Sequence, residues 1–450
     1  MTLSLAELHP SLHDLFHDTA DQLARQTGFC RRQRKLTGTV FAQTLVFSLL
    51  DNPAATLDDF ADNAAEHLVT PVSAQAFDQR FTQAAACFLQ ELFLEAFNRS
   101  FDSARPAVLP LLRRFRGVYL RDATLVSLPA SLADYFPGRG GRHAAHGQAA
   151  AVKLVLEAEL TTGLLTDVSL LAGLDNDKVA EVASNPVPAG ALLLEDMGFL
   201  SGARLQHYIN EGVYVVTPIP AWTAVFAETG RRLNLVKELR KAKGWRYERR
   251  VLILHEHKVA VRLLAVRVTD EECRRRQERV RREAKKRGRP VSQKKLDLCA
   301  WNILVTNAPA ALLGAEEACV VRRVRWQIEL VFKVFKSEGR IDQTRSHQRW
   351  RVLCELYAKL LGMVVQQWLL LAAGYQMLRH SARRAARRVR REALVVLAGL
   401  GEAATLVQVV ARLAVVLERR CVICRRRLTP STLDRLRELD PQCNPRQAAA

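Results

Sequence analysis

Apolar residues begin to alternate in a strand-like manner after Arg116, and this change of pattern restricts the fold more than any other feature. The residues before it carry apolar positions at helical spacing, and strands need a period of two instead. The expected elements are three consecutive antiparallel strands in 117–129, 151–160 and 164–173, a helix around Asp177–Ser184, and two more strands in 191–199 and 212–220. The middle of the chain is therefore predicted to form a mixed α/β sheet.

Three strands followed by helix-strand-helix-strand is the order of a ribonuclease-H-like sheet, the kind found in retroviral integrases. In open α/β sheets of this sort, sites form at strand ends. The segment Trp222–Pro309 predicts further strands, two within 250–268 and one within 298–309, so that a β-rich insertion interrupts the sheet. We expect helical regions on both sides of this catalytic domain.

The chain is strongly basic, which favours a polyanionic partner. It has 450 residues, with 67 Lys and Arg against 46 Asp and Glu, a net charge of +21. Each phosphate that a cation neutralises releases condensed counterions, so such a surface binds nucleic acid. An anionic membrane is the competing partner, but no run of 18 uncharged apolar residues exists, and the apolar segment 352–375 reads as a buried helix.

Nine scattered cysteines and an acidic start without a signal-peptide pattern indicate a protein of the reducing cytoplasm. Cys421 and Cys424 form a CxxC pair, but no second pair lies at zinc-ligand spacing, and we expect no metal there.

The N-terminal helices include a candidate helix-turn-helix. Leu57–Leu68, a turn through 69–72 and a helix from Ala74 to Phe88 have the right lengths, with Thr56 and Ser73 as N-caps. The second helix would present Gln75, Asp78, Gln79 and Arg80 to DNA, and the basic cluster Arg31, Arg32, Arg34 and Lys35 precedes it. Two successive helices without any DNA contact are the ordinary alternative.

The stretch Val321–Arg340 predicts a helix with an apolar face beside a column of cations. Val324, Ile328, Val331, Phe332 and Phe335 share one sector. The adjoining sector holds one carboxylate among basic residues, namely Glu329 with Arg322, Arg325, Lys333 and Lys336. A surface helix with ion pairs of about 0.3 kcal/mol explains this pattern. The alternative is that Glu329 faces a metal ion while the cations hold phosphates.

Two further acids lie where such a metal site needs them. Asp122 is in the middle of an apolar strand, and Asp196 is at the tip of the strand in 191–199. A solvated Asp122 and a turn-capping Asp196 remain possible readings, and Glu195 is an alternative ligand. A carboxylate in an apolar strand is costly unless it is paired or liganded. Together the three acids form the set for two Mg²⁺ ions about 4 Å apart.

Three motifs resemble the signatures of DDE transposases of bacterial insertion sequences, and of the IS-four group in particular. They are RDAT at Arg121–Thr124, DMGF at Asp196–Phe199, and Arg325-x3-Glu329-x6-Lys336. The similarity runs from about Thr37 to Lys359. The group has a tyrosine three residues before the motif arginine, and this chain has Arg322 there, an arginine that can still bind phosphate.

The resemblance implies Asp122, Asp196 and Glu329 as the metal-binding catalytic triad, with two Mg²⁺ that Mn²⁺ can replace. It implies Arg325 and Lys336 as contacts to double-stranded DNA at terminal inverted repeats and at the target, and we expect the neighbouring cations Arg322 and Lys333 to contact the same DNA. It also implies a bacterial protein associated with the nucleoid. Phosphodiester hydrolysis would free a 3′-hydroxyl that attacks target DNA, in a cut-and-paste route with a hairpin on the transposon end. Relatives act as homodimers on paired ends.

In the insertion, the resemblance implies that Trp301 stacks on a flipped base, a contact worth about 1–3 kcal/mol. A core tryptophan in an alternating strand is the other reading. The cationic run Cys273–Pro290 is expected to contact phosphates. A second basic run, Ser381–Glu392, either helps to pair two subunits or packs within one.

Two other functions remain open: a catalytically silent DNA-binding regulator derived from a transposase, and a nuclease of the same fold that cuts without joining. The expected domains are a helical DNA-binding domain in 1–105, the catalytic domain in 106–220 and 310–345, the β-rich insertion in 221–309, and a helical C-terminal region in 346–450.

Overall fold

A computed structural model describes residues 3–32, 35–99, 101, 109–138, 149–177, 186–423 and 430–439 of the chain. The chain forms two compact units, each assembled from separated segments. The first unit contains residues 1–106, 123–175 and 327–428, and the second contains 107–122, 176–326 and 429–450. Some parts of the chain named above lie wholly or mostly outside the described residues. They are the expected helix around Asp177–Ser184, the residues Arg34 and Cys424, and the C-terminal tail.

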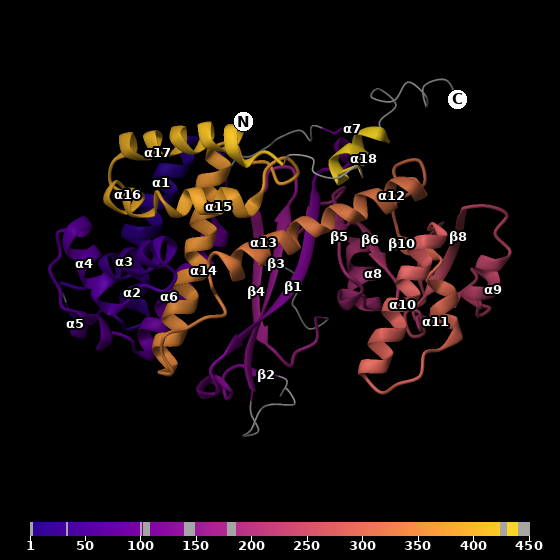
Figure 1. The fold of residues 1–450 in the computed structure, drawn as a ribbon, viewed down its shortest axis with the longest axis horizontal. Coiled ribbons are helices and arrows are strands. Elements are labelled where there is room, and N and C mark those ends of the chain that lie inside the picture. The colour runs from indigo at the N-terminus through magenta and orange to yellow at the C-terminus, as the bar shows by residue number, and fades with distance from the viewer. Residues whose placement is uncertain are drawn as a thin grey trace. The chain divides into compact units, whose positions relative to one another are not determined.

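The N-terminal segment of the first unit is helical, as predicted (Figure 1). Its helices are α1 (Leu5–Asp14), α2 (Ala20–Gln26), α3 (Gly38–Asp51), α4 (Leu57–Leu68), α5 (Ala74–Asp78) and α6 (Gln83–Asn98), with a π-helical turn at Leu15–Thr19 between α1 and α2. The side chains of Thr56 and Ser73 accept hydrogen bonds from backbone N–H groups in the first turns of α4 and α5, which confirms both predicted N-caps.

The prediction of one long helix from Ala74 onward is wrong, because the chain forms two helices there, α5 and α6. The side chain of Thr82 accepts a hydrogen bond from the N–H of Ala85 and so begins a new helix there. Phe77 and Phe81, on either side of the break, are both buried. The second helix of the candidate helix-turn-helix therefore has five residues instead of fifteen.

The other helices of the first unit pack around one apolar helix, α14 (Arg349–Ala372), which contacts α3 and α6. Nearly all of α14 is buried, as its sequence predicts, including the polar residues Glu355, Lys359, Gln366 and Gln367. Within the described part of the chain, no helix has the length and apolar character needed to cross a membrane. The remaining helices are α13 (Trp326–Ser337), α15 (Ala382–Arg390), α16 (Ala393–Ala398) and α17 (Ala403–Val416), with a π-helical turn at Leu417–Cys421.

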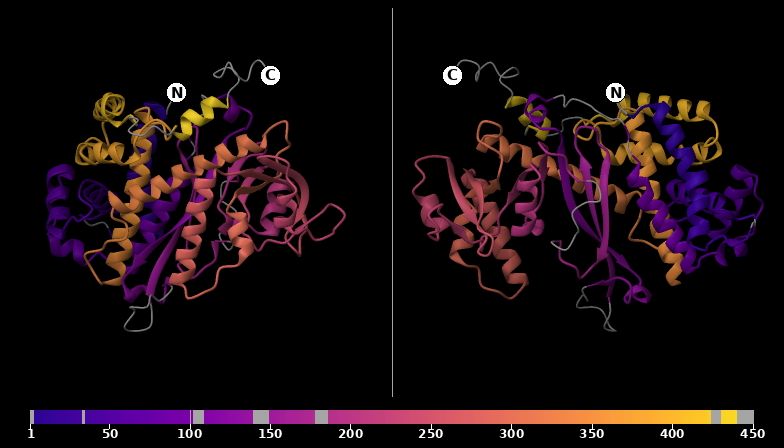
Figure 2. Two further views of the ribbon diagram at one scale, coloured as in Figure 1. Left: turned by 45° about the vertical axis from the view of Figure 1, so that its right-hand side comes forward. Right: turned by 180° about the vertical axis from the view of Figure 1, so that it is seen from behind.

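The first unit also contains a long antiparallel pair of strands, visible in both views of Figure 2. These strands are β3 (Ala149–Glu159) and β4 (Leu165–Ala172), and the short β2 (Pro137–Gly138) pairs with β3. The strand β1 (Val118–Leu128) passes from one unit to the other between Asp122 and Ala123. All three predicted strands of this stretch are present.

The second unit is built on a sheet in the order β1-β5-β6-β10-β9-β8-β7. β5 (Leu192–Leu194) pairs in parallel with β1 and with β6 (Tyr214–Pro218), and the remaining neighbours are antiparallel. The strands predicted for the insertion are present and continue the same sheet through β10, which pairs with β6. They are β8 (Arg246–Ile253), β9 (Val259–Arg267) and β10 (Trp301–Thr306). The short β7 (Val225–Phe226), which pairs with β8, is not among the predicted strands.

One face of this sheet forms an apolar core with α8 (Gly202–Asn210), which packs against β6 and β9. Leu193, Val215 and Val305 from the strands are fully or almost fully buried in this core. The other helices of the unit are α7 (Pro110–Arg113), α9 (Leu235–Arg240), α10 (Asp270–Lys286), α11 (Gln293–Leu298), α12 (Ala315–Arg322) and α18 (Thr432–Glu438). The fold is therefore mixed α/β, as the sequence predicts.

Candidate active site

The two aspartates of the predicted triad come from neighbouring parallel strands. The register pairs Val118 of β1 with Leu192 of β5, and Leu120 with Leu194. Continued by two residues, this register places Asp122 level with Asp196, whose backbone is still extended with φ −85° and ψ 163°. Adjacent strands lie about 4.8 Å apart, and side chains alternate between faces. The sheet therefore presents both carboxylates on the same face, just beyond the paired part of β1 and β5.

Each aspartate has an arginine partner. Nη1 of Arg325 donates to Oδ2 of Asp122 at 2.6 Å, and Nη2 of Arg322 lies 3.6 Å from Oδ1 of Asp196. Asp122 is thus held in an ion pair and is not a solvated strand residue, since its side chain is only 17% exposed. Asp196 occupies the N-cap position of the 3-10 turn Met197–Phe199 but makes no side-chain cap hydrogen bond there. Its carboxylate pairs with Arg322 instead.

Both arginines lie in a break between helices, where the sequence alone predicts a continuous helix. α12 ends at Arg322, a 3-10 turn covers Arg323–Arg325, and α13 begins at Trp326. The turn changes the angular spacing of side chains from about 100° to about 120° per residue. Burial and the positive charge of Arg325 lower the pKa of Arg322, while Asp196 acts in the opposite direction. Two guanidinium groups thus accompany two carboxylates.

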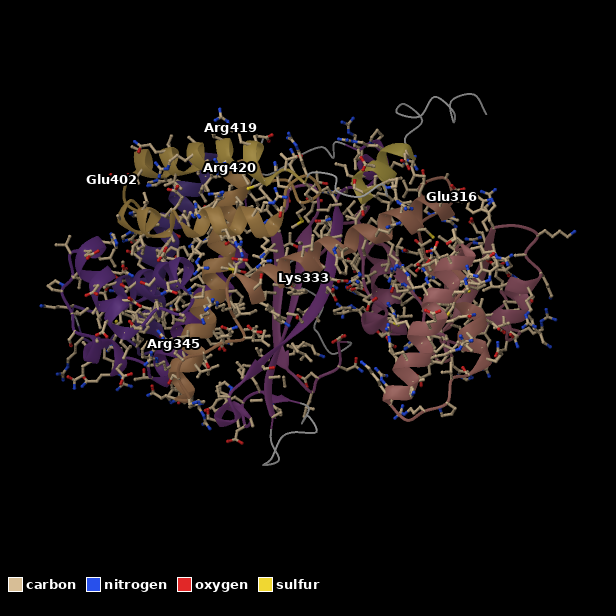
Figure 3. All side chains as sticks on the ribbon, in the orientation of Figure 1. Glu316, Lys333, Arg345, Glu402, Arg419 and Arg420 are labelled. Carbon is tan, nitrogen blue, oxygen red and sulfur yellow. The ribbon has the colours of Figure 1, made fainter. Side chains whose placement is uncertain are left out.

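The remaining residues of the predicted motif belong to the first unit, on α13. The apolar face of this stretch is confirmed, because Val324, Ile328 and Phe335 are all nearly inaccessible to solvent. Glu329 is partly buried in the first turn of α13. Lys333 is exposed, and Figure 3 shows it on α13. Nζ of Lys336 donates to the carbonyl oxygen of Leu125 in β1 at 2.7 Å.

The donor chemistry of the site suits a hard divalent cation, because the carboxylates of Asp122 and Asp196 are oxygen ligands of the kind Mg²⁺ prefers. Among the described residues, no group of three or more His, Cys, Asp or Glu side chains is placed to hold a metal ion. The guanidinium groups of Arg325 and Arg322 balance the charges of the two aspartates.

Glu195, the alternative ligand, turns to the other face of the sheet. Its side chain is 4% exposed, and its Oε1 lies 3.0 Å from Nη1 of Arg121 and 3.5 Å from Nε of Arg204. The hydroxyl of Tyr208 donates to the same oxygen at 3.3 Å. Glu195 is therefore part of a buried network of ion pairs and hydrogen bonds. The sequence contains a signal for this network: the residues that precede the two aspartates, Arg121 and Glu195, carry opposite charges to each other.

The residues of the N-terminal helices that are predicted to contact DNA differ in their exposure. Gln75 and Gln79 are exposed at α5. Arg80 is occupied within the protein, because its Nη2 donates to the carbonyl oxygen of Phe29 at 2.8 Å and its guanidinium stacks over the Phe29 ring at 3.9 Å. Contact between Gln75, Gln79 and DNA stays a prediction.

Trp301, in β10, is partly buried and packs against the apolar core of the second unit, as the core-tryptophan reading predicts. Stacking of Trp301 on a base stays a prediction. Two other tryptophans of the predicted insertion are more open, Trp222 at 78% and Trp245 at 49% exposure. α10, which contains most of the cationic run Cys273–Pro290, has no buried residue.

Comparison with known proteins places this geometry in a family. A family model described as "Transposase DDE domain" matches residues 113–364, more than half of the chain. The chain is similar to the transposase for insertion sequence element IS231F of Bacillus thuringiensis subsp. israelensis, with 25% identity over 388 residues that cover 81% of this chain and 80% of the relative.

A second relative is the transposase for insertion sequence element IS231E of Bacillus thuringiensis subsp. finitimus, with 27% identity over 383 residues, 81% of this chain and 78% of the relative. Among solved structures, a piggyBac transposase in a synaptic complex with hairpin DNA aligns over 94% of this chain and 87% of its own, with a TM-score of 0.47 and 10% identity.

Proposed function

This chain belongs to the DDE-domain transposase family, and from that premise we propose that Asp122, Asp196 and Glu329 are its metal-binding catalytic triad. As a member of the family, it is an enzyme that cleaves and transfers DNA. The family works with divalent metal ions, and we propose two Mg²⁺, replaceable by Mn²⁺. The observation that carries the assignment is the level placement of Asp122 and Asp196 on adjacent parallel strands.

The finer fold that we propose is ribonuclease-H-like. Its support is the parallel set β1-β5-β6 together with the antiparallel pair β3 and β4, which is the strand composition expected of that sheet. Asp196 follows the carboxyl end of β5, and Asp122 lies within β1 just beyond its pairing with β5, near the edge where open α/β sheets form their sites. The boundaries of the N-terminal, catalytic, insertion and C-terminal domains stay predictions.

The arginines have two partners in this proposal. Before DNA binds, Arg325 and Arg322 neutralise Asp122 and Asp196. When DNA enters, the scissile phosphates attract the guanidinium groups, which bind phosphate through paired N–H donors, and the carboxylates become available. Arg322, which replaces the tyrosine of the group, thereby gains a phosphate-binding role. Lys333 and Lys336 would contact the strand from α13.

Metal ions held by the three acids would activate the attacking oxygen and stabilise the leaving one. The protein residues position the phosphodiester, and positioning supplies much of the catalysis in phosphoryl transfer. The proposed substrates are the terminal inverted repeats of an insertion sequence and then target DNA, with a 3′-hydroxyl as the second nucleophile. We further propose that two copies act on paired ends, and that excision passes through a hairpin.

The test is Mg²⁺-dependent cleavage of a duplex carrying the element's terminal repeat. Asp122→Asn keeps the size of the side chain and removes its charge, so we expect the cleavage rate to fall on the order of 10³-fold or more. DNA binding in EDTA should stay within about twofold, because binding depends on cations. Asp134→Asn is the matched control, since Asp134 is an exposed acid that pairs with Arg349.

Two outcomes separate the other functions. A wild-type protein that binds the repeat but never nicks it with Mg²⁺ or Mn²⁺ is a regulator. A protein that nicks the repeat but gives no joined product with a target plasmid is a nuclease. Recovery of strand-transfer products that disappear with Asp122→Asn rules out both.

A further inference from the structure

A buried cluster of charged and polar side chains lies one residue away from each proposed catalytic aspartate. It consists of Arg121, Glu195, Arg204 and Tyr208, and none of the four is more than 7% exposed. We call it the Glu195 cluster, because Oε1 of Glu195 is its centre. Arg121 comes from β1, Glu195 follows β5, and the other two come from α8.

Hydrogen bonds connect all four side chains of the Glu195 cluster. Oε1 of Glu195 accepts from Nη1 of Arg121 at 3.0 Å and from the Tyr208 hydroxyl at 3.3 Å. Nε of Arg204 donates to the Tyr208 hydroxyl at 3.0 Å, and Nη1 of Arg121 donates to the same hydroxyl. The guanidinium of Arg204 also lies over the ring of Phe199, 5.4 Å from its centroid, in the turn that follows Asp196. β1, the segment that follows β5 and this turn are therefore all linked to α8.

The register of the sheet places this cluster directly behind the site. Arg121 is level with Glu195 by the same continuation that makes Asp122 level with Asp196. Side chains of successive strand residues point to opposite faces. The arginine–glutamate pair therefore joins β1 and β5 on one face, one residue before the two aspartates emerge on the other.

We propose that the Glu195 cluster is a positioning device that fixes the spacing of the Asp122 and Asp196 carboxylates and so sets the affinity of the site for divalent cations. This inference rests on the proposed function, because it takes both aspartates to be metal ligands. The residues act through the backbone of β1 and of the β5 end. A reacting group displaced by 1 Å can lose about 100-fold in rate, so a fixed spacing is valuable here.

Tyr208 gives the least disruptive way to loosen the cluster. Burial, followed by the negative charge of Glu195, raises the pKa of Tyr208 to about 12, so its hydroxyl stays neutral and can both donate and accept. Tyr208→Phe removes this bridge and keeps the ring in the core. Arg121 and Glu195 remain paired, and the fold is retained.

The experiment measures Mn²⁺ binding by electron paramagnetic resonance to the full chain bound to a precleaved terminal-repeat duplex, the state in which both arginines are expected to contact phosphate. It is combined with the Mg²⁺ concentration that gives half-maximal nicking. For Tyr208→Phe we expect Mn²⁺ affinity to fall about tenfold, the usual effect of losing a partner behind a metal ligand. The half-maximal Mg²⁺ concentration should rise in parallel, while DNA binding in EDTA stays unchanged.

Tyr247→Phe is the matched control, because the Tyr247 hydroxyl in β8 donates to Glu238, which is itself ion-paired with Arg249, as in the Glu195 cluster. It should bind Mn²⁺ as the wild type does. Glu195→Gln provides a second variant with a larger expected loss; if it does not fold, Tyr208→Phe decides alone. Equal Mn²⁺ affinities for Tyr208→Phe and Tyr247→Phe would overturn the inference.

Asp122→Asn separates this inference from the proposed function. If Asp122→Asn binds Mn²⁺ as well as the wild type does, the aspartates are not ligands and the proposed function fails first. If Asp122→Asn loses Mn²⁺ binding while Tyr208→Phe keeps it, the proposed function stands and the positioning role is wrong.

Discussion

At the scale of single residues, the strand period decides which charges meet. Asp122 and Arg121 are neighbours in sequence, yet one pairs with Arg325 and the other with Glu195. Shifting β5 by one residue against β1 would make Asp122 level with Glu195, two like charges on one face, and would leave the buried Arg121 without its partner. The charges of Arg121 and Asp122 in RDAT, and of Glu195 and Asp196 in EDMGF, therefore specify the register as well as the chemistry.

A residue-scale prediction concerns His17, in the π-helical turn that follows α1. Burial and the nearby His13, whose ring stacks 4.3 Å away, lower the pKa of His17. The unfolded chain, with a histidine pKa of about 6.5, then binds more protons than the folded one. Stability should therefore fall as the pH drops below about 6.5. Urea midpoints at pH 7.5 and 5.5 should differ less for His17→Gln than for the wild type.

His347→Gln provides the control for this measurement, since His347 is exposed. Its midpoints should change with pH as those of the wild type do. An unchanged pH dependence in His17→Gln would show that other groups cause the loss of stability in acid.

At the scale of elements, ion pairs link the C-terminal end of α13 to α15. Glu338 directly follows α13, is 6% exposed, and accepts from Nε of Arg383 at 2.7 Å and of Arg387 at 3.0 Å, both on α15. Arg384 of the same helix donates to the carbonyl oxygen of Arg420. Three arginines of the second basic run are thus used within the first unit, in agreement with the intramolecular reading of this run.

Glu338→Gln should lower the free energy of unfolding at pH 7 by about 1–3 kcal/mol, a range that allows for the exposed ends of both arginines. Burial raises the pKa of Glu338, but hydrogen bonds from Arg387 and Arg383 outweigh it and lower the pKa. The folded pKa lies below the unfolded one, so this stabilisation is present above about pH 4.3 and is lost as the pH falls through the folded pKa.

Denaturant titration at pH 7 and at pH 3.5 checks this expectation. The wild type and Glu338→Gln should differ at pH 7 and converge in acid. Glu402→Gln, at an exposed acid labelled in Figure 3, is the control and should match the wild type at both pH values. A constant difference at both pH values would contradict the ionic explanation.

At the scale of the whole molecule, the net charge of +21 is carried largely by cations that are exposed in the described chain. α10 is the clearest case, since it presents Arg281, Arg282 and Lys285 to solvent and buries none of its residues. Part of its charge is balanced internally, because Glu272 pairs with Arg275 and Arg276. We therefore expect the last turns of α10 to contact DNA phosphates.

The triple variant Arg281→Gln, Arg282→Gln, Lys285→Gln should weaken DNA binding and reduce the slope of log K against log[salt] by about 2–3, the value for three lost phosphate contacts. Electrophoretic mobility-shift assays at salt concentrations from about 50 to about 200 mM measure this slope. A control triple variant at Arg391, Arg419 and Arg420, exposed cations of the C-terminal helices (Figure 3 labels the last two), removes the same charge. Equal slopes for both triple variants would show that only net charge matters.

Much of the architecture follows from local periodicity, which the sequence contains. The predicted strands, the apolar face of α13 and the burial of α14 all depend on neighbours within a few residues, and all are confirmed. The family follows as well, since the spacing of RDAT, DMGF and Arg325-x3-Glu329-x6-Lys336 is a linear property.

Tertiary structure alone decided which charges pair. Strand alternation does not reveal which strands are neighbours, so the pairing of Arg121 with Glu195 and the use of Arg322 and Arg325 as partners of the aspartates could not be read from spacing. The break of a predicted helix at Thr82 and the capture of Arg80 by Phe29 also depend on packing between distant segments. A buried charge is stable only beside its partner, and partners far apart in sequence meet only in the fold.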